Sequence, residues 1–170
     1  SDRLGKVADG KTVLDFDAEE KKRKVSVSCA LANFDWRDRK INIIDTPGLF
    51  DFATGVSEGI RAAETVLIVT KSGSGVGVGA EKAYKAATER GMSKYIIVTG
   101  CDAENANFYK TVDAFQEGFG KKVCPVVVPY VVGDKVECYV NFLQNKAFAY
   151  KDGKATQVDM PSSERIDQHT

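Results

Sequence analysis

The chain has 170 residues, enough for one domain or for one domain with a small appendage. Its 24 basic and 24 acidic residues cancel, so the overall charge does not favour direct, charge-driven binding of DNA or RNA, and only a local patch could support it. The four cysteines are far apart and the single histidine, His169, lies in the polar tail, so neither a zinc cluster nor a histidine-based catalytic dyad is expected.

The sequence also indicates the cellular compartment in which the chain is expected. Cysteines within apolar runs, as in "KKVCPVVVPYVV", are typical of buried thiols in a reducing compartment. No apolar run approaches the ~18 residues of a membrane span, and no signal peptide is recognisable. We therefore expect a cytoplasmic protein with no membrane partner.

The first motif along the chain is "GKVADGKT", Gly5 to Thr12, which fits the Walker A pattern G-x-x-x-x-G-K-[ST]. A phosphate loop needs a buried strand before it and a helix after it. Only four residues precede the match, and the "DAEEKKRK" that follows has no apolar stripe with which a helix could dock. We expect a polar loop here, and a solvated segment at the charge run "EEKKRK".

The remaining elements follow from hydrophobic periodicity. "VSVSCALANFDW" and "RKINIID" predict two strands joined by a tight turn at Arg37 and Asp38. Buried strands are expected at "TVLIVTK", "KYIIVTG" and "VCPVVVPYVV", and helices at "SEGIRAAE", at "GAEKAYKAATERG" closed by Gly91, and at "ENANFYKTVDAFQEGFG".

Apolar strands alternating with helices predict an α/β fold: a mostly parallel sheet with helices on both faces. Beyond Gly133 the pattern changes to short strands around the turn "KDG". We therefore expect a core at residues 1–132 and the start of a small accessory subdomain at residues 133–170.

Ligands of open α/β sheets bind beyond the carboxyl ends of the strands. "DTPG", Asp45 to Gly48, follows an apolar strand, and a carboxylate three residues before a glycine suits a magnesium-linked sensor of a terminal phosphate. An ordinary strand exit into a Pro-Gly turn explains the pattern equally well.

Two further loops follow strands. Gly75, Gly77 and Ala80 fit the dinucleotide pattern G-x-G-x-x-A, with Asp102 ~20 residues beyond. That fingerprint belongs on the first strand of a sheet, so a flexible loop is the simpler interpretation. In "TGCD", Thr99 to Asp102, only the aspartate remains of the Asn-Lys-x-Asp signature of guanine pockets, and Gly100 cannot cover a base.

In order and spacing, "KINIIDTPGLFDF", "TVLIVTKSGSGVGVGAEKAYKAATERG" and "DAENANFYKTVDAFQEGFGKKVCPVVVPYVVGD" resemble the GTPase domain of translational GTPases, specifically elongation factor G. The similarity runs from about Asp2 to beyond Pro161. It implies a truncated P-loop-NTPase-like fold in which "GKVADGKT" falls in the first switch region, so its match to Walker A is accidental. The family's own P-loop is expected upstream of Ser1.

The resemblance also implies site residues. Asp45 and Gly48 match the magnesium and γ-phosphate sensors, and Ser26 falls where the switch threonine ligates magnesium. The base-reading signature is reduced to "TGCD", in which Thr99 and Asp102 are assigned to the nucleotide. The family's histidine after D-x-x-P-G is replaced by Leu49, which forms no hydrogen bond, so no catalytic residue is assigned.

The resemblance implies GTP or GDP with magnesium as ligands, and the ribosome as a partner, of a longer parent protein. One hypothesis is a fragment of an elongation-factor-G-type GTPase coupled to translocation. The alternative is a degenerate paralogue acting as a ribosome-binding or regulatory module, and a third is a fragment with no activity of its own. Each charge-assisted hydrogen bond to phosphate is worth ~1.5–3 kcal/mol, so tight nucleotide binding without the P-loop is not expected.

The resemblance also bears on the sheet. The missing strand belongs between "RKINIID" and "TVLIVTK", and its loss exposes two unpaired edges. We expect these strands to pair directly, to borrow a strand from another chain, or to pair with upstream residues absent from this sequence.

Overall fold

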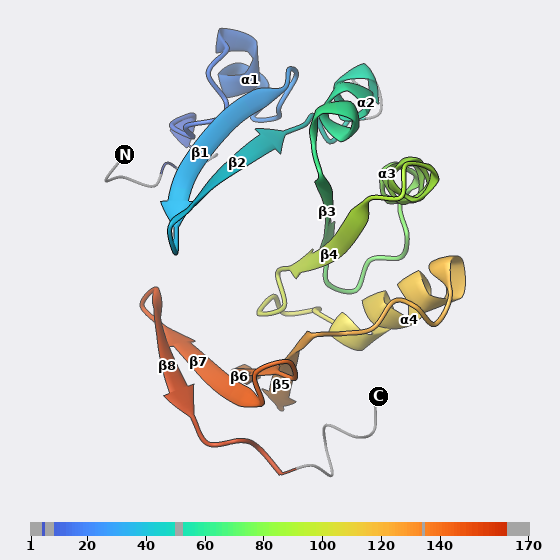
Figure 1. Cartoon of the computed structure of the whole chain (residues 1–170). Helices are drawn as coiled ribbons and strands as arrows, with labels where there is room; N and C mark the ends of the chain where they lie inside the picture. The colour runs from blue at the N-terminus through green and yellow to red at the C-terminus, as the bar shows by residue number, and fades with distance from the viewer. Residues whose placement is uncertain (1–4, 6–8, 50–52, 134, 163–170) are drawn as a thin grey trace. The chain divides into compact units, whose positions relative to one another are not determined.

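The structure is a computed structural model that describes residues 5, 9–49, 53–133 and 135–162 (Figure 1). Helices and strands alternate through most of the chain, and the predicted α/β class is confirmed. The described elements are, in order, α1 (Ala18–Arg23), β1 (Ala30–Trp36), β2 (Arg39–Asp45), α2 (Ala53–Ala62), β3 (Thr65–Lys71), α3 (Val78–Glu89), β4 (Ser93–Thr99), α4 (Phe108–Phe119), β5 (Val127–Val132), β6 (Lys135–Asn141), β7 (Lys146–Lys151) and β8 (Lys154–Val158).

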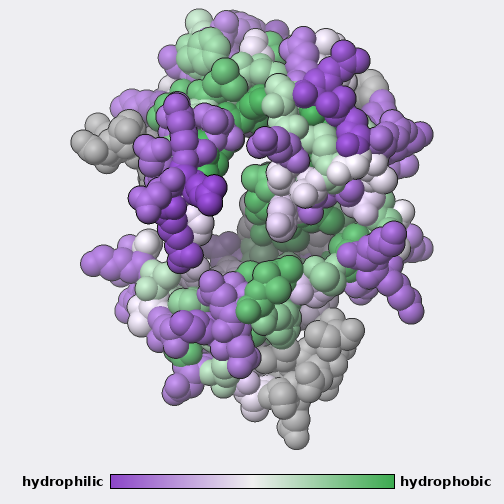
Figure 2. All heavy atoms as spheres, viewed as in Figure 1, coloured by the Kyte–Doolittle hydropathy of each residue, from purple (hydrophilic) through white to green (hydrophobic). Residues whose placement is uncertain are grey.

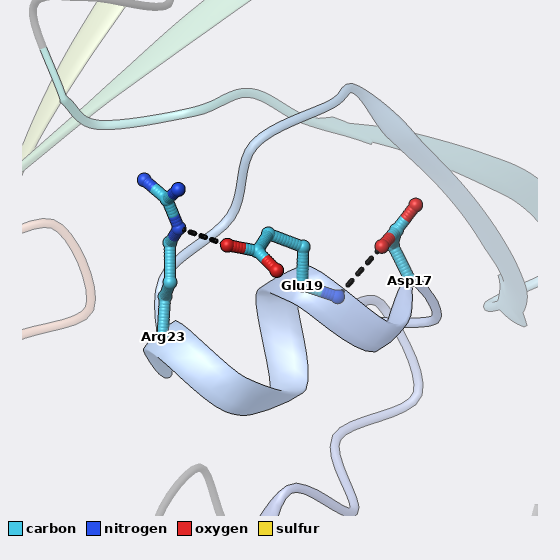
Figure 3. Close-up of polar contacts among 3 residues, drawn as sticks. All are labelled: Asp17, Glu19 and Arg23. Atoms are coloured by element: carbon cyan, nitrogen blue, oxygen red, sulfur yellow. Dashed lines mark hydrogen bonds and ion pairs between the residues drawn. The ribbon is translucent and has the colours of Figure 1, made fainter.

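Most of the charge run "EEKKRK" lies in helix α1, and five of its six residues are exposed, as expected of a solvated segment, whereas Glu20 is buried. Asp17 caps α1 by accepting a hydrogen bond from Glu19 N at 2.7 Å, and Arg23 Nε donates to Glu19 Oε1 at 2.6 Å (Figure 3). Glu20 completes a capping box by accepting from Asp17 N at 3.1 Å, and it is only 1% exposed. The reciprocal cap stabilises a six-residue helix that has no apolar stripe.

The predicted hairpin is present. β1 and β2 pair antiparallel, with Trp36 opposite Arg39 and Ala30 opposite Asp45. Arg37 and Asp38 form the turn, with φ of 46° and 60°. β1 begins at Ala30 rather than at residue 25. The preceding backbone has no strand partner among the described residues, because Val27 N and Ser28 N donate to the Glu20 side chain instead.

The chain divides into two compact units. One comprises Ser1–Ile68 with Val78–Tyr95, and the other comprises Val69–Gly77 with Ile96–Thr170. In the first unit α2 contacts α3, and the chain leaves α3 through Gly91, the predicted end of this helix, which has a left-handed conformation (φ 64°).

β3 and β4 form a two-stranded sheet. In the second unit Ser72 N donates to Thr99 O at 2.9 Å, so the two carboxyl ends lie together, as in a parallel pair. β2 and β3 belong to different sheets of the described structure, so the expectation that they pair directly is wrong. The other two arrangements stay predictions.

The strand at Val127–Val132 does not extend the β3–β4 pair. It begins a four-stranded antiparallel sheet of order β5-β6-β7-β8, because a hairpin through Gly133 (φ 62°) is more local than a crossover. The core of this sheet contains Val128, Cys138, Val140 and Ala147, with Phe108 of α4 packed against it.

Candidate functional site

Asp45 is the last residue of β2, at the carboxyl end where the sequence predicts a phosphate sensor. Its side chain is half-buried. Burial raises the pKa of its carboxyl, and the negative charges of Asp15 and Glu20 raise it further. The strand therefore ends in a carboxylate with two acidic neighbours.

The segment after Asp45 packs closely against α2. A Cβ on Gly59 would lie 2.6 Å from Thr46 Cγ2, and one on Gly55 would lie 3.0 Å from Pro47 Cδ and 3.1 Å from Cys29 Sγ. Pro47 is fully buried, and the Cys29 thiol donates to Gly55 O at 3.2 Å. The sequence prediction began this helix at residue 57 and missed the contact, although two glycines four residues apart were the available signal.

Gly48 differs from these two glycines. It is exposed, its φ is not in the left-handed region, and a Cβ built on it would meet no atom within 4 Å. The packing of the chain therefore gives no reason for glycine here, which is consistent with close approach of a ligand to its backbone. Leu49, which follows, is 46% exposed.

Ser26 is held by an acidic side chain. Its Oγ donates to Asp15 Oδ1 at 3.0 Å, and Thr12 Oγ1 donates to Asp15 Oδ2 at 2.6 Å. The charge of Asp15 also raises the pKa of Asp45, so the same carboxylate interacts with both predicted magnesium ligands, Ser26 and Asp45. No motif marks Asp15 in the sequence, and it was missed.

Glu20 fixes the main chain that follows Ser26. Its Oε1 accepts hydrogen bonds from Val27 N at 2.9 Å and Ser28 N at 3.1 Å. These bonds lower the pKa of its carboxyl. The residues that sequence analysis assigned to a strand are thus fixed by α1.

The hard oxygen donors of this unit suit magnesium, which takes one or two carboxylates together with phosphate and water oxygens. A divalent cation would offset the mutual repulsion of Asp15, Glu20 and Asp45. No cluster of three or more His, Cys, Asp or Glu side chains with metal-binding geometry occurs among the described residues, so a ligand would have to supply part of the coordination.

The Walker A match does not form a phosphate cradle in its described part. A Cβ on Gly5 would overlap Lys11 O, so the backbone of the motif closes on itself. Thr12 uses its hydroxyl on Asp15, and the next helix begins only at Ala18. Residues 6–8 of the motif lie outside the described residues.

The second unit holds the other predicted pair. Thr99 ends β4, and its Oγ1 donates to Thr70 O at 3.1 Å, so the hydroxyl fastens the loop to the neighbouring strand. Gly100 has φ 66° and Asp102 is exposed. Tyr139 of β6 was missed: burial raises the pKa of its phenol, with further contributions from Cys101 and Asp102, so it lies near this loop.

The glycine-rich loop after β3 is anchored at its start. Gly73 N donates to Asn107 O at 3.0 Å and to Thr111 Oγ1 at 2.8 Å, and Thr111 is buried. Cβ atoms on Gly75 and Gly77 would meet nothing within 4 Å. The flexible-loop interpretation of this segment stays a prediction.

A pocket of about 410 Å³ opens in the second unit, lined by Tyr130, Glu137, Cys138, Val158, Asp159 and Pro161. None of the five predicted site residues lines it. Among the described helices, none combines the length and the apolar character needed to cross a membrane.

Comparison with known proteins adds to this geometry. Residues 1–164 match the family model described as the elongation factor Tu GTP binding domain. An elongation factor G-like protein of Thermotoga maritima is 35% identical over 92% of this chain and 23% of its own length. One of Mycobacterium tuberculosis is 34% identical over 91% and 21%.

Elongation factor G of Mycoplasma pneumoniae is 26% identical over 92% of this chain and 23% of its own length. A solved structure from Thermus thermophilus superposes with a TM-score of 0.90 at 26% identity, covering 98% of this chain and 25% of that one. The chain spans less than a quarter of the length of these sequence relatives.

Proposed function

The chain belongs to the family of the elongation factor Tu GTP binding domain, and from this premise we propose that it forms part of the nucleotide site of a longer, elongation-factor-G-type GTPase that works on the ribosome. The observation that carries the proposal is the family match across residues 1–164, with Asp45 at the end of β2 and an open Gly48 three residues on. Cytoplasmic localisation is part of the same proposal.

In this proposal Asp45 and Ser26 hold magnesium, and Gly48 N–H meets the terminal phosphate. Magnesium bound there would neutralise phosphate charge and link the phosphates to the protein. Ser26 donates its hydroxyl proton to Asp15 at 3.0 Å, which leaves the lone pairs of Ser26 Oγ free to ligate magnesium. Thr99 fixes the base-side loop through its bond to Thr70 O, and Asp102 accepts hydrogen bonds from the guanine edge.

The division into a core at residues 1–132 and an accessory subdomain from residue 133 is also proposed. The sheet β5–β8 includes residues on both sides of that boundary. β5 would then be the last strand of the core and would pair with β6 of the accessory part.

Two positions favour a second candidate, a paralogue that binds the ribosome with weak hydrolysis or none. Leu49 cannot orient an attacking water, and Gly100 offers no side chain to cover the base. Phosphoryl transfer depends mainly on positioning and charge stabilisation, so a partner that supplies both would leave the enzyme hypothesis intact.

The test is GTP hydrolysis by a protein that carries this chain within the length of its relatives, measured with and without ribosomes. A rate that ribosomes raise supports the enzyme. Equal rates, together with cosedimentation with ribosomes, favour the paralogue, and the absence of both activities contradicts both hypotheses.

The variant Leu49→His sharpens the test because it restores a hydrogen-bonding side chain. On the enzyme hypothesis it should raise the stimulated rate by about tenfold or more, the range of general acid–base and positioning effects. Leu143→His is the matched control, since Leu143 is 81% exposed and lies outside the proposed site.

A further inference from the structure

The turn between β1 and β2 has residues that its backbone does not favour. Arg37 and Asp38 both have positive φ, 46° and 60°, a conformation that aspartate tolerates but that costs arginine conformational energy. The same two-residue turn between β7 and β8 uses Asp152 and Gly153, one of the favoured pairs for this geometry. Turn stability therefore does not explain Arg37.

The Arg37 side chain stacks on an exposed aromatic ring. Its guanidinium carbon lies 4.5 Å from the centroid of the Trp36 ring, and Trp36 is 55% exposed. Arg39 is the cross-strand partner of Trp36, so it lies on the same face of the hairpin. An exposed indole is thus accompanied by two guanidinium groups.

The same face continues along the strand. Phe34, two residues before Trp36, is 46% exposed and lies opposite Ile41. The two aromatic residues are about 7 Å apart along the strand. This face therefore presents two rings in a row beside the cations.

Among the described residues, no ion pair joins Arg37 or Arg39 to a nearby acidic side chain. Asp35 lies opposite Lys40, on the other face of the hairpin, and Asp38 is in the turn itself. Figure 2 shows mostly hydrophilic residues at the turn end of this hairpin, which Figure 1 places as the end remote from α1. The charge on the aromatic face thus comes from Arg37 and Arg39.

This surface is separate from the proposed nucleotide site. Asp45 is six residues along β2 from Arg39, which corresponds to about 20 Å in an extended strand. A ligand at the hairpin end would therefore not contact Asp45.

We propose that the hairpin end formed by Phe34, Trp36, Arg37 and Arg39 binds a single-stranded segment of RNA. Bases stack on the two rings, and the guanidinium groups contact the flanking phosphates. Exposed aromatic residues on a sheet face are how sheet-based RNA-binding domains hold unpaired bases. An acidic peptide would use the cations but give the paired rings no partner. The choice of RNA over DNA rests on the proposed ribosomal role.

The test is fluorescence anisotropy of a labelled uridine oligomer of about twelve nucleotides, a length within the site sizes of single-strand binders. The protein is the whole chain, without GTP, so the result does not depend on nucleotide binding. The key variant combines Arg37→Asn with Asp38→Gly, which gives the turn a favoured sequence and should stabilise the hairpin. Weakened binding in this variant cannot then come from unfolding.

This variant is expected to bind about tenfold more weakly, and its affinity should depend less steeply on salt, because it loses a phosphate contact. Trp36→Ala should lose a similar factor with a smaller change in the salt slope. The matched control combines Lys151→Ala with Lys154→Ala, which removes two cations from the turn of the β7–β8 hairpin and should leave the affinity unchanged.

Four results would overturn the proposal: no binding of the oligomer by the native chain, an equal loss in the lysine control, tighter binding of a polyglutamate peptide than of the RNA, or equal binding of a thymidine oligomer. The last would reject RNA as the specific ligand. Failure of GTP hydrolysis in the longer protein would leave each of these readouts unchanged, so the two proposals fail separately.

Discussion

Ser26 Oγ donates a hydrogen bond to Asp15 Oδ1 at 3.0 Å, and the same Asp15 carboxylate raises the pKa of Asp45. One side chain thus accepts a hydrogen bond from one proposed magnesium ligand and places negative charge near the other. Magnesium bound by Ser26 and Asp45 would offset that negative charge. Asp15 is therefore the residue through which the two proposed ligands can be tested together.

Asp15→Asn should lower the pKa of Asp45, because it removes a neighbouring negative charge. The measurement is a carboxyl ¹³C NMR titration of both proteins. Asp35→Asn is the control, since Asp35 lies near the turn end of the same hairpin and should leave Asp45 unchanged. An identical Asp45 titration in native chain and Asp15→Asn would contradict the shared electrostatic environment.

Glu20→Ala should destabilise the fold by about 1–3 kcal/mol, because backbone donors at Val27, Ser28 and Asp17 lose a buried acceptor. Chemical denaturation measures this. Glu19→Ala is the matched control: it removes an exposed ion pair with Arg23 and should cost only ~0.5 kcal/mol or less. Equal losses in the two variants would show that the buried contacts of Glu20 do not stabilise the segment.

The lowered pKa of Glu20 also makes the stability of the fold depend on pH. The pKa is lowered in the folded chain, so the stability that Glu20 contributes is complete above the unfolded-state pKa of about 4.3 and is lost as the pH falls through the folded-state value. Glu20→Gln should flatten the loss of stability below about pH 4.3. A native-like acid profile in this variant would mean that other carboxylates cause the loss.

Gly59→Ala should destabilise the chain although alanine is the better helix former, because its Cβ would lie 2.6 Å from Thr46 Cγ2. Gly79→Ala in α3, where a Cβ would meet nothing, should instead stabilise it by up to ~1 kcal/mol. Adding Thr46→Ser removes the opposing methyl and should restore much of the loss at Gly59. Thermal unfolding of the single and double variants checks this, and additive effects would contradict the contact.

Thr111→Val should cost about 1–3 kcal/mol, because the buried hydroxyl accepts from Gly73 N at 2.8 Å. Thr111→Ser keeps the hydroxyl and serves as the control. Hydrogen exchange at Gly73 should accelerate in the valine variant alone. Unchanged exchange in both variants would show that Asn107 O, at 3.0 Å, suffices to hold the loop.

Periodicity predicted most of the secondary structure, because local patterns determine it. β3 appeared at its predicted bounds, and the Arg37–Asp38 turn and the left-handed Gly91 lie where the sequence placed them. The expectation that β5 belongs to the parallel core sheet was wrong, since it pairs antiparallel with β6 and its apolar run fits a parallel or an antiparallel neighbour equally well.

The candidate site was predictable only where a motif marks it. Asp45 and Gly48 stand in "DTPG", whereas Asp15 and Glu20 act through contacts that no spacing rule describes. Glu20 was hidden in a charge run whose ordinary interpretation is a solvated surface. The close approach of α2 to Thr46 and Pro47 requires glycine at Gly55 and Gly59. Two glycines four residues apart are only a weak indication of such a contact in a sequence.

The measurement that tests the account most directly is the magnesium-dependent affinity of a fluorescent GTP analogue for a protein carrying this chain within the length of its relatives. Because Asp45 is a proposed magnesium ligand and Lys11 lies outside the proposed site, Lys11→Ala should bind like the native protein, whereas Asp45→Ala should lose about tenfold or more of its magnesium-dependent affinity. Binding that disappears in Lys11→Ala and survives Asp45→Ala would make "GKVADGKT" the phosphate loop and contradict the account.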